Sequence, residues 1–172
     1  DKYGNQLTII NGEDNSTVTI AVKNYPVAVA VNPITNKIYV ANAGSDTVSV
    51  IDGASYGTVT LAAAGSPSAV AVNPVTNRIY TVLNDADILQ VIDGATNAIT
   101  LSGTGSGPIA VAVNPVTDRI YVANQKSNSV TEYQGNDLYH QTTIPVGSVP
   151  SAIAVNPVTN KIYVADRNAD SV

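Results

Sequence analysis

The sequence holds a single histidine, which is the first residue to consider for acid–base chemistry. His140 lies in an irregular segment, EYQGNDLYHQT, in which Glu132 and Asp137 are the acidic residues. An imidazole beside carboxylates can act as a proton donor, a proton acceptor or a ligand group. A lone histidine without matched partners is weak evidence for such a site, so we expect His140 to be a surface residue on an outer strand.

Covalent chemistry finds little support in the composition. The 172 residues include no Cys, which excludes a thiolate nucleophile, a disulfide and a cysteine metal site. Serine and threonine are common, but a hydroxyl nucleophile needs a base within hydrogen-bond reach, and the only histidine is His140. We therefore predict that the chain has no catalytic residues, no bound metal and no cofactor.

Carboxylates recur in the loops that should follow the second strand of each repeat. They are Asp46, Asp85, Asp87, Asp166 and Asp170. Oxygen ligands of this kind suit a hard cation such as Ca²⁺. Their spacing matches no defined calcium-binding loop, which favours solvated turn residues over a cation site.

Basic residues recur at one position in each of four repeats, directly after a turn. They are Lys37, Arg78, Arg119 and Lys161. A ring of four positive charges on one face could bind an anionic glycan. The simpler interpretation, which we favour, is a charge that keeps the turn soluble and discourages strand pairing at the edge.

These bases belong to a repeat of about 41 residues. Asn-Pro occurs at Asn32, Asn73, Asn114 and Asn156, and the spacing is 41, 41 and 42 residues. The surrounding segments are nearly identical: PVAVAVNPITNKIYVAN, PSAVAVNPVTNRIYTVL, PIAVAVNPVTDRIYVAN and PSAIAVNPVTNKIYVAD. Four copies at this period indicate a repeat architecture.

Each repeat predicts four short antiparallel strands. In the first copy, 28–31 alternates small and branched residues, an Asn-Pro turn follows, and 38–41 is the return strand. The third and fourth strands, 47–51 and 58–62, have an Asp-Gly turn between them. Four strands in about 40 residues are typical of a β-propeller blade. We predict an all-β propeller without any helix longer than one turn.

The phase of the repeat divides the chain into blades. The segment 1–24 supplies the third and fourth strands of a split blade, 149–172 supplies the first and second strands of another, and whole blades span 25–65, 66–106 and 107–148. The segments 1–7 and 166–172 fall at equivalent positions and compete for one strand. We therefore expect a fragment of a larger propeller or a strand-exchanging assembly ahead of a lone four-bladed ring.

The repeated stretch N-P-x-T-[ND]-[KR]-I-Y-[VT] resembles the YVTN family of β-propeller repeats, known from surface-layer and secreted proteins of archaea and bacteria. The second copy departs from the motif at Tyr80 to Leu83, and the fourth ends in Asp166. The resemblance implies an extracellular or cell-surface location. The motif residues that we expect to be structural are Asn32, Pro33, Tyr39, Asn73, Pro74, Tyr80, Asn114, Pro115, Tyr121, Asn156, Pro157 and Tyr163, with the tyrosines packed between blades and their hydroxyls bonded.

Charge and hydropathy narrow the possible partners. The net charge is −5 with 12% charged residues, and no run of Lys or Arg could neutralise a line of phosphates, so we predict no nucleic-acid partner. Purely apolar stretches such as Val27 to Val31 are too short to cross a membrane.

Two functions then compete. The first is a non-enzymatic extracellular or cell-surface scaffold for protein or glycan interaction or for self-assembly, with strand addition between copies of the chain or between adjacent blades. The alternative is a fragment of a lactonase-like or lyase-like propeller enzyme whose catalytic residues lie in blades outside this sequence. The innermost strands read AVAV three times and AIAV once, without catalytic groups. We therefore predict the scaffold.

Overall fold

The asparagine that opens each repeated turn also determines its local geometry. In the computed structural model, which describes residues 4–168, the Asn32 side-chain oxygen accepts hydrogen bonds from the backbone N–H groups of Ile34 (3.0 Å) and Thr35 (3.3 Å). Asn36 closes the turn with a φ of 52°. Asn and Asp tolerate this left-handed conformation better than other non-glycine residues, which explains why the motif places only Asn or Asp there.

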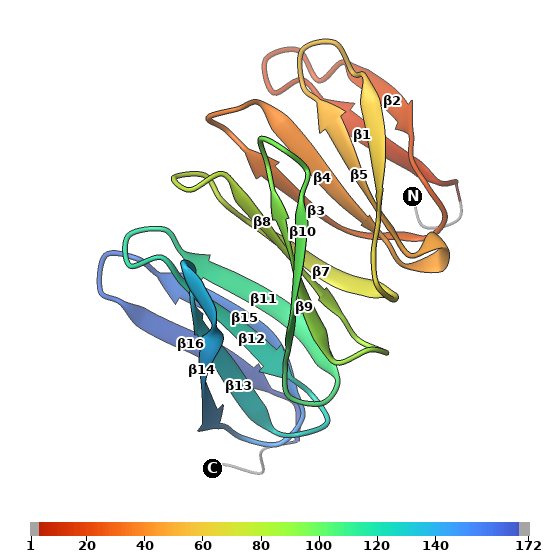
Figure 1. The fold of residues 1–172 in the computed structure, drawn as a ribbon. Helices are drawn as coiled ribbons and strands as arrows, with labels where there is room; N and C mark the ends of the chain where they lie inside the picture. Colours follow the sequence, from red (N-terminus) through yellow and green to blue (C-terminus); the bar gives the residue numbers. More distant parts are fainter. Residues whose placement is uncertain (1–3, 169–172) are drawn as a thin grey trace.

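The turns join strands into five antiparallel sheets (Figure 1). Sheet 1 has two strands, β1 (Gln6–Ile10) and β2 (Thr17–Ala21). Sheet 2 has four: β3 (Pro26–Asn32), β4 (Lys37–Asn42), β5 (Thr47–Asp52) and β6 (Thr58–Ala62). Sheet 3 also has four: β7 (Pro67–Asn73), β8 (Arg78–Leu83), β9 (Ile88–Asp93) and β10 (Ile99–Gly103).

The remaining strands repeat the pattern. Sheet 4 contains β11 (Pro108–Asn114), β12 (Arg119–Asn124), β13 (Ser129–Gln134) and β14 (Asp137–Pro145). Sheet 5 contains β15 (Pro150–Asn156) and β16 (Lys161–Asp166). Within residues 4–168 the only helical segment is a single 3-10 turn, Ala43–Ser45. The predicted all-β architecture of four-stranded antiparallel sheets is confirmed.

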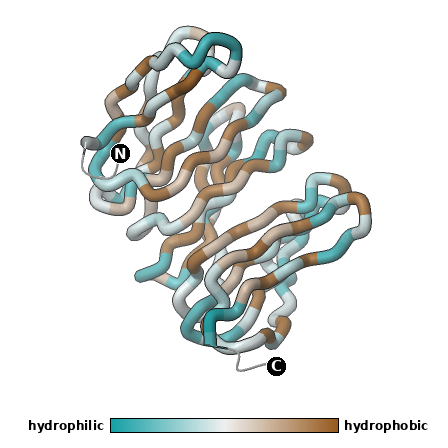
Figure 2. The backbone as a smooth tube through the Cα atoms, turned by 180° about the vertical axis from the view of Figure 1, so that it is seen from behind, coloured by the Kyte–Doolittle hydropathy of each residue, from teal (hydrophilic) through white to brown (hydrophobic). Residues whose placement is uncertain are grey.

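The core lies between neighbouring sheets rather than within any one of them. Tyr39 and Val48 of sheet 2 pack against Ile79 and Ile92 of sheet 3. The same arrangement joins sheets 3 and 4, where Tyr80 is one of the buried residues. Figure 2 shows hydrophobic segments along the strands of each sheet. Each sheet therefore depends on its neighbours for burial, as repeat units generally do.

The sheets stack into an open arc. The first strands β3, β7, β11 and β15 contact one another in series, so they form the inner side of the arc. Figure 1 places the β1–β2 hairpin and the β15–β16 hairpin at opposite ends. Neither β1 nor β16 pairs with a further strand among the described residues. Of the two segments expected to compete for one position, residues 1–3 and 169–172 lie outside the described part.

One expectation about the repeated tyrosines needs correction. The hydroxyl of Tyr39 is buried but makes no hydrogen bond to any described residue. Tyr133, which lies outside the motif, does have a partner, because its hydroxyl donates to the carbonyl oxygen of Gly103 at 2.5 Å. At Tyr39, therefore, the motif position buries an aromatic ring without a bonded hydroxyl.

We predict that the protein loses stability at alkaline pH through its buried tyrosines. Burial raises the pKa of Tyr80 to about 12, from an ordinary value of 10.0. The unfolded chain therefore ionises first, so the stabilisation is complete below pH 10 and falls by about 2 kcal/mol for Tyr80 as the pH approaches 12. Urea-unfolding curves between neutral pH and pH 12 would measure this loss.

The matched variants are Tyr80→Phe and Tyr163→Phe. Tyr80→Phe should reduce the alkaline loss. Tyr163→Phe should leave it unchanged, because the Tyr163 side chain is still 56% exposed in the folded protein. Identical pH profiles for the wild type and Tyr80→Phe would contradict the prediction.

Candidate functional site

The motif asparagines connect neighbouring sheets as well as closing their own turns. The side-chain amide of Asn32 donates to the side-chain oxygen of Asn77 at 2.8 Å. Asn73 donates to Asp118 at 2.8 Å. The third repeat continues the series, with Asn114 donating to Asn160 at 2.9 Å. Each of these bonds runs from the first strand of one sheet to the turn of the next, which makes the motif a structural ladder.

Two of the four repeated bases also reach the next sheet. The ammonium group of Lys37 donates to the carbonyl oxygen of Gly94 at 3.2 Å. The Arg78 guanidinium donates to the carbonyl oxygen of Gly135. These acceptors occupy equivalent turns of sheets 3 and 4, so the two bases connect sheets at equivalent places.

The other two bases are placed differently. Arg119 forms an ion pair with Glu132 of its own sheet. Lys161 is exposed at the start of β16. The described contacts of Lys37, Arg78 and Arg119 are to different partners, and a common anionic ligand for the four bases remains a prediction.

The motif tyrosines differ between the interior sheets and sheet 5, whereas the motif prolines occupy the same place in every copy. Tyr39, Tyr80 and Tyr121 are buried, whereas Tyr163 on sheet 5 is exposed. The prolines lie in the turns between first and second strands: Pro33, Pro74, Pro115 and Pro157. Asn156 of sheet 5 keeps its turn bonds to the backbone N–H groups of Val158 (3.0 Å) and Thr159 (3.2 Å).

Two of the loop carboxylates, Asp85 and Asp87, bind backbone groups. Asp85 accepts a hydrogen bond from the N–H of Ser66 at 2.9 Å, and Asp87 accepts one from the N–H of Gly107 at 2.7 Å. Asp170 lies outside the described residues. Within residues 4–168, no three His, Cys, Asp or Glu side chains are grouped so that they could hold a metal ion.

The regular pattern changes at one hairpin, between β13 and β14. Gln134 pairs with Asp137 across a two-residue turn, but the neighbouring residue Tyr133 pairs with Gln141. This shift leaves 138–140 as a bulge on β14. In sheets 2 and 3 the third and fourth strands pair without such a shift. Bulges redirect side chains and are frequent beside functional sites.

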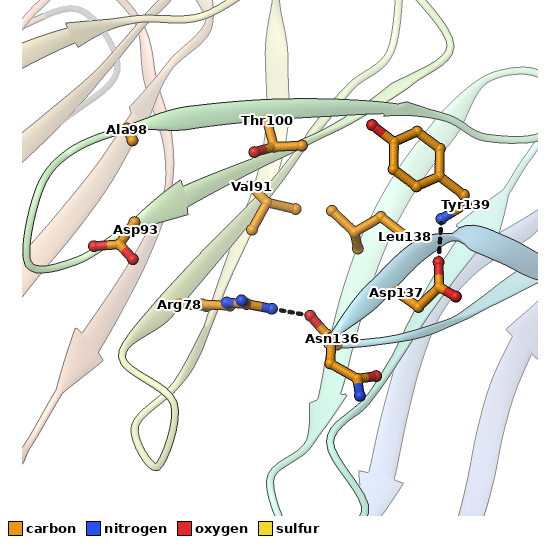
Figure 3. Close-up of a pocket in the computed structure, with 10 residues that line it drawn as sticks. Arg78, Val91, Asp93, Ala98, Thr100, Asn136, Asp137, Leu138 and Tyr139 are labelled. Carbon is orange, nitrogen blue, oxygen red and sulfur yellow. Dashed lines mark hydrogen bonds between the residues drawn. The ribbon is translucent and has the colours of Figure 1, made fainter.

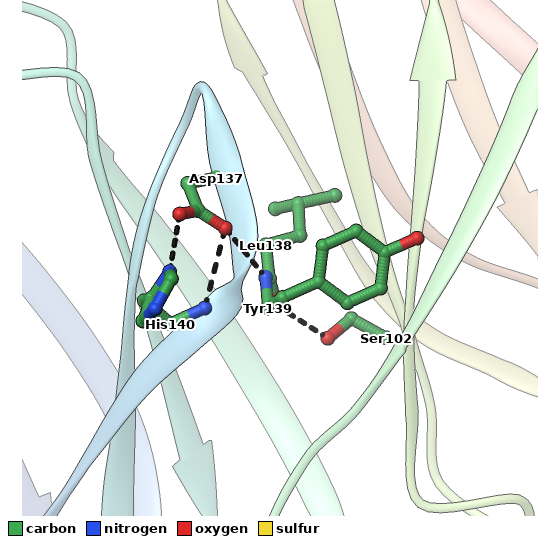
Figure 4. Close-up of polar contacts among 5 residues, drawn as sticks. All are labelled: Ser102, Asp137, Leu138, Tyr139 and His140. Carbon is green, nitrogen blue, oxygen red and sulfur yellow. Dashed lines mark hydrogen bonds and ion pairs between the residues drawn. The ribbon is translucent and has the colours of Figure 1, made fainter.

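Hydrogen bonds hold the bulge in place (Figure 4). The Asp137 carboxylate accepts from the backbone N–H groups of Tyr139 (3.0 Å) and His140 (3.3 Å) and also pairs with the His140 ring. The hydrogen bond from His140 lowers the pKa of Asp137 below its ordinary value. From sheet 3, the Ser102 hydroxyl donates to the carbonyl oxygen of Leu138 at 2.9 Å.

A cleft of about 320 Å³ lies between this hairpin and the outer strands of sheet 3 (Figure 3). It is lined by Arg78, Val91, Asp93, Ala98, Thr100, Gly135, Asn136, Asp137, Leu138 and Tyr139. Tyr139 is 86% exposed. A second hollow, which also includes Tyr139, contains His140, Arg119 and Glu132.

Sequence reasoning singled out His140 and its acidic neighbours but missed Tyr139, Asn136 and the contribution of sheet 3. The available signal was the loss of the regular turn in the third copy. The His140 side chain is 85% exposed, as expected for a surface residue. Its pairing with Asp137 therefore lies in a high-dielectric setting, which weakens its electrostatic effect on any reaction.

Comparisons with known proteins agree with this architecture. Neither a protein-family model nor a curated protein matches the sequence. A functionally unknown protein from Desulfotomaculum acetoxidans has a similar structure, with a TM-score of 0.82, 13% identity and a match over 96% of this chain and 57% of that chain. A chain of a nidogen/laminin complex matches with a TM-score of 0.73, 12% identity and coverage of 96% and 68%.

The fold is a β-propeller. Its sheets are the blades, and the chain spans little more than half the length of the first of these neighbours. Identities this low establish the fold alone. Among the described residues, no helix is long and apolar enough to cross a membrane.

We predict that the bond between Asn73 and Asp118 stabilises the propeller measurably. Asn73→Ala removes both the turn bonds and the bond to the next blade, and it leaves the partly buried Asp118 oxygen without this donor. We expect a loss of about 2–3 kcal/mol in the free energy of unfolding, measured by denaturant titration.

The control is Asn156→Ala, at the equivalent position of sheet 5. It removes only the turn bonds, because no blade follows sheet 5 among the described residues, so its cost should be about 1 kcal/mol. Equal losses for the two variants would show that the ladder bond contributes nothing.

Proposed function

We propose that this protein is a non-enzymatic propeller scaffold, located outside the cell or on its surface, that binds other proteins, glycans or further copies of itself. The absence of differentiated chemistry on the inner strands supports this role. In the described part, β3, β7, β11 and β15 contain only Pro, Val, Ala, Ile, Ser and Asn. None of these side chains titrates, so the inner side offers no acid or base to a substrate.

The observation that carries the proposal is the complementarity of the two half-blades. Sheet 5 consists of a first and a second strand, and sheet 1 consists of a third and a fourth. When the copies of the repeat are aligned, residues 6–11, which include β1, correspond to residues 47–52 of sheet 2. A β1–β2 hairpin joined to β16 would therefore complete a four-stranded blade.

The exposed residues of the half-blades are those that a whole blade buries against its neighbours. Tyr163 is 56% exposed, whereas the equivalent Tyr39 is fully buried. Ile10 is 65% exposed, whereas the equivalent Ile51 is fully buried. Burying a side chain of this size contributes about 1.5–3 kcal/mol. Completion of the blade would thus be driven by the interactions that already stabilise the interior blades.

Sheet 2, the first whole blade, has a second exposed apolar surface. Val29 and Val31 on β3 are 54% and 52% exposed. Their equivalents on β7, Val70 and Val72, pack against the core between sheets 2 and 3. An apolar sheet face of this kind suits another blade, because the interior blades bury the same positions.

Two resemblances support the location and the kind of partner. The motif resembles YVTN repeats of surface-layer and secreted proteins, and one structural neighbour comes from a nidogen/laminin complex, which is an assembly of proteins. Both favour a binding or assembly role over catalysis. The identity of a protein or glycan partner is part of the proposal.

The interior blades specify the register of such an assembly. In sheet 2, Val40 pairs with Ser49 and Ala41 with Val48. At the equivalent positions of the two half-blades, Val164 would lie opposite Thr8, and Ala165 opposite Leu7. The pairing between the second and the third strand is the same in all three whole blades, which makes this register the expected one.

Engineered cysteines test the assembly directly, because the natural sequence has none. We expect a mixture of Thr8→Cys and Val164→Cys chains to form a disulfide-linked heterodimer on mild oxidation, since paired strands place the two Cα atoms within bonding range. Light scattering on the unmodified chain should show a mass that rises with concentration.

The register control pairs Thr8→Cys with Ile162→Cys, two residues along the same strand. Its cross-linking yield should be much lower, because the two residues are diagonal rather than opposite. A monomer at every concentration, together with equal cross-linking in both mixtures, would overturn the assembly part of the proposal.

A further inference from the structure

We propose that the cleft beside the β14 bulge binds a neutral saccharide, with the Tyr139 ring as the surface on which the sugar stacks. The inference rests on the proposed binding function and assigns it a site and a ligand class. The site lies on the outer strands, apart from the half-blade edges. It can therefore be tested separately from assembly.

Tyr139 is 86% exposed, which is more than any other tyrosine among the described residues. Its position is nevertheless held: its own N–H donates to Asp137, and the carbonyl of the preceding residue accepts from Ser102. An aromatic ring presented to solvent on an anchored backbone loses little conformational entropy when a ligand covers it. This arrangement favours a binding surface over a loosely placed side chain.

Polar groups surround the ring on the floor and wall of the cleft. Thr100 and Asn136 line it, and no hydrogen bond to another described residue is recorded for either side chain. Arg78 and Asp93 lie on the side of sheet 3 (Figure 3). The cleft thus combines one apolar ring face with hydroxyl, amide, carboxylate and guanidinium groups.

A sugar ring has the matching chemistry. Its C–H face can lie on an aromatic face, while its hydroxyls both donate and accept hydrogen bonds at the edge. A volume of about 320 Å³ is at the small end of ligand sites and suits one or two sugar rings. Charge selects among sugars: Arg78 is accompanied by the carboxylates of Asp93 and Asp137, so the cleft has no excess positive charge for an anionic glycan.

The site occurs once in the described blades. At the equivalent hairpin of sheet 2 the residue nearest in kind is Tyr56, which is 39% exposed and follows a regular turn without a bulge. The corresponding hairpin of sheet 3 carries Asn97. The saccharide site therefore arises from the bulge and not from the repeat.

Saturation-transfer NMR on the full chain tests the proposal, with the methyl glycosides of glucose, galactose, N-acetylglucosamine and glucuronic acid as probes. We expect at least one of the three neutral glycosides to bind, and the glucuronide to bind more weakly. Tyr139→Ala should weaken the affinity about tenfold or more, whereas Tyr139→Phe keeps the ring and should retain most of it. Asn136→Ala should weaken binding by removing hydrogen bonds to the hydroxyls.

Tyr56→Ala is the matched control and should bind like the wild type. Binding to none of the neutral glycosides, or unchanged binding by Tyr139→Ala, would overturn the saccharide site. Preferred binding of the glucuronide would overturn the choice of a neutral sugar. Cysteine cross-linking of Tyr139→Ala chains should proceed as in the parent, so a failure of the saccharide site and a failure of assembly give different results.

Discussion

The packing of one sheet against the next is the interaction on which the rest of this structure depends. A four-stranded sheet of this composition has two apolar faces, and neither can be buried within the sheet itself. Tyr39 is buried only because Ile79 and Ile92 of the following sheet cover it. The equivalent contact between sheets 3 and 4 buries Tyr80. Each contact between neighbouring sheets therefore adds to the stability of the whole. A sheet face without a neighbour remains an apolar surface that another blade can cover.

Polar groups at one end of the sheets complement this packing and explain why the motif tolerates so little change. The Asn32 side chain uses its oxygen to close its own turn and its amide to reach Asn77 in the next sheet. The turn beside Asn36 also requires Gly53, because a Cβ atom there would collide with the Asn36 side chain. One short segment therefore encodes a turn, a contact to the next sheet and the close approach of a third loop.

The strands and turns could be predicted from the sequence, whereas the contacts between residues far apart in the chain could not. The Asn-Pro turn and the alternation of Ala and Val are determined by neighbouring residues, so the strands and the all-β class followed directly. The acceptor of Lys37 is Gly94, 57 residues further along the chain, and no pattern around Lys37 indicates it. Likewise, the exposure of Tyr139 depends on a register shift between β13 and β14, because simple alternation cannot show which of several residues is extruded.

Repetition and its interruption favour different kinds of binding. A group that belongs to the motif recurs in each copy, so a ligand that recognised it would meet several equivalent sites along the arc. Repeated surfaces are therefore best matched by other repeated surfaces, as when one blade packs against the next. A ligand unlike the protein requires a place where the pattern changes. Among the described blades, the β13–β14 hairpin is where the third-to-fourth strand pairing departs from the common register, and it brings Tyr139 beside Asp93 and Thr100 of the neighbouring blade.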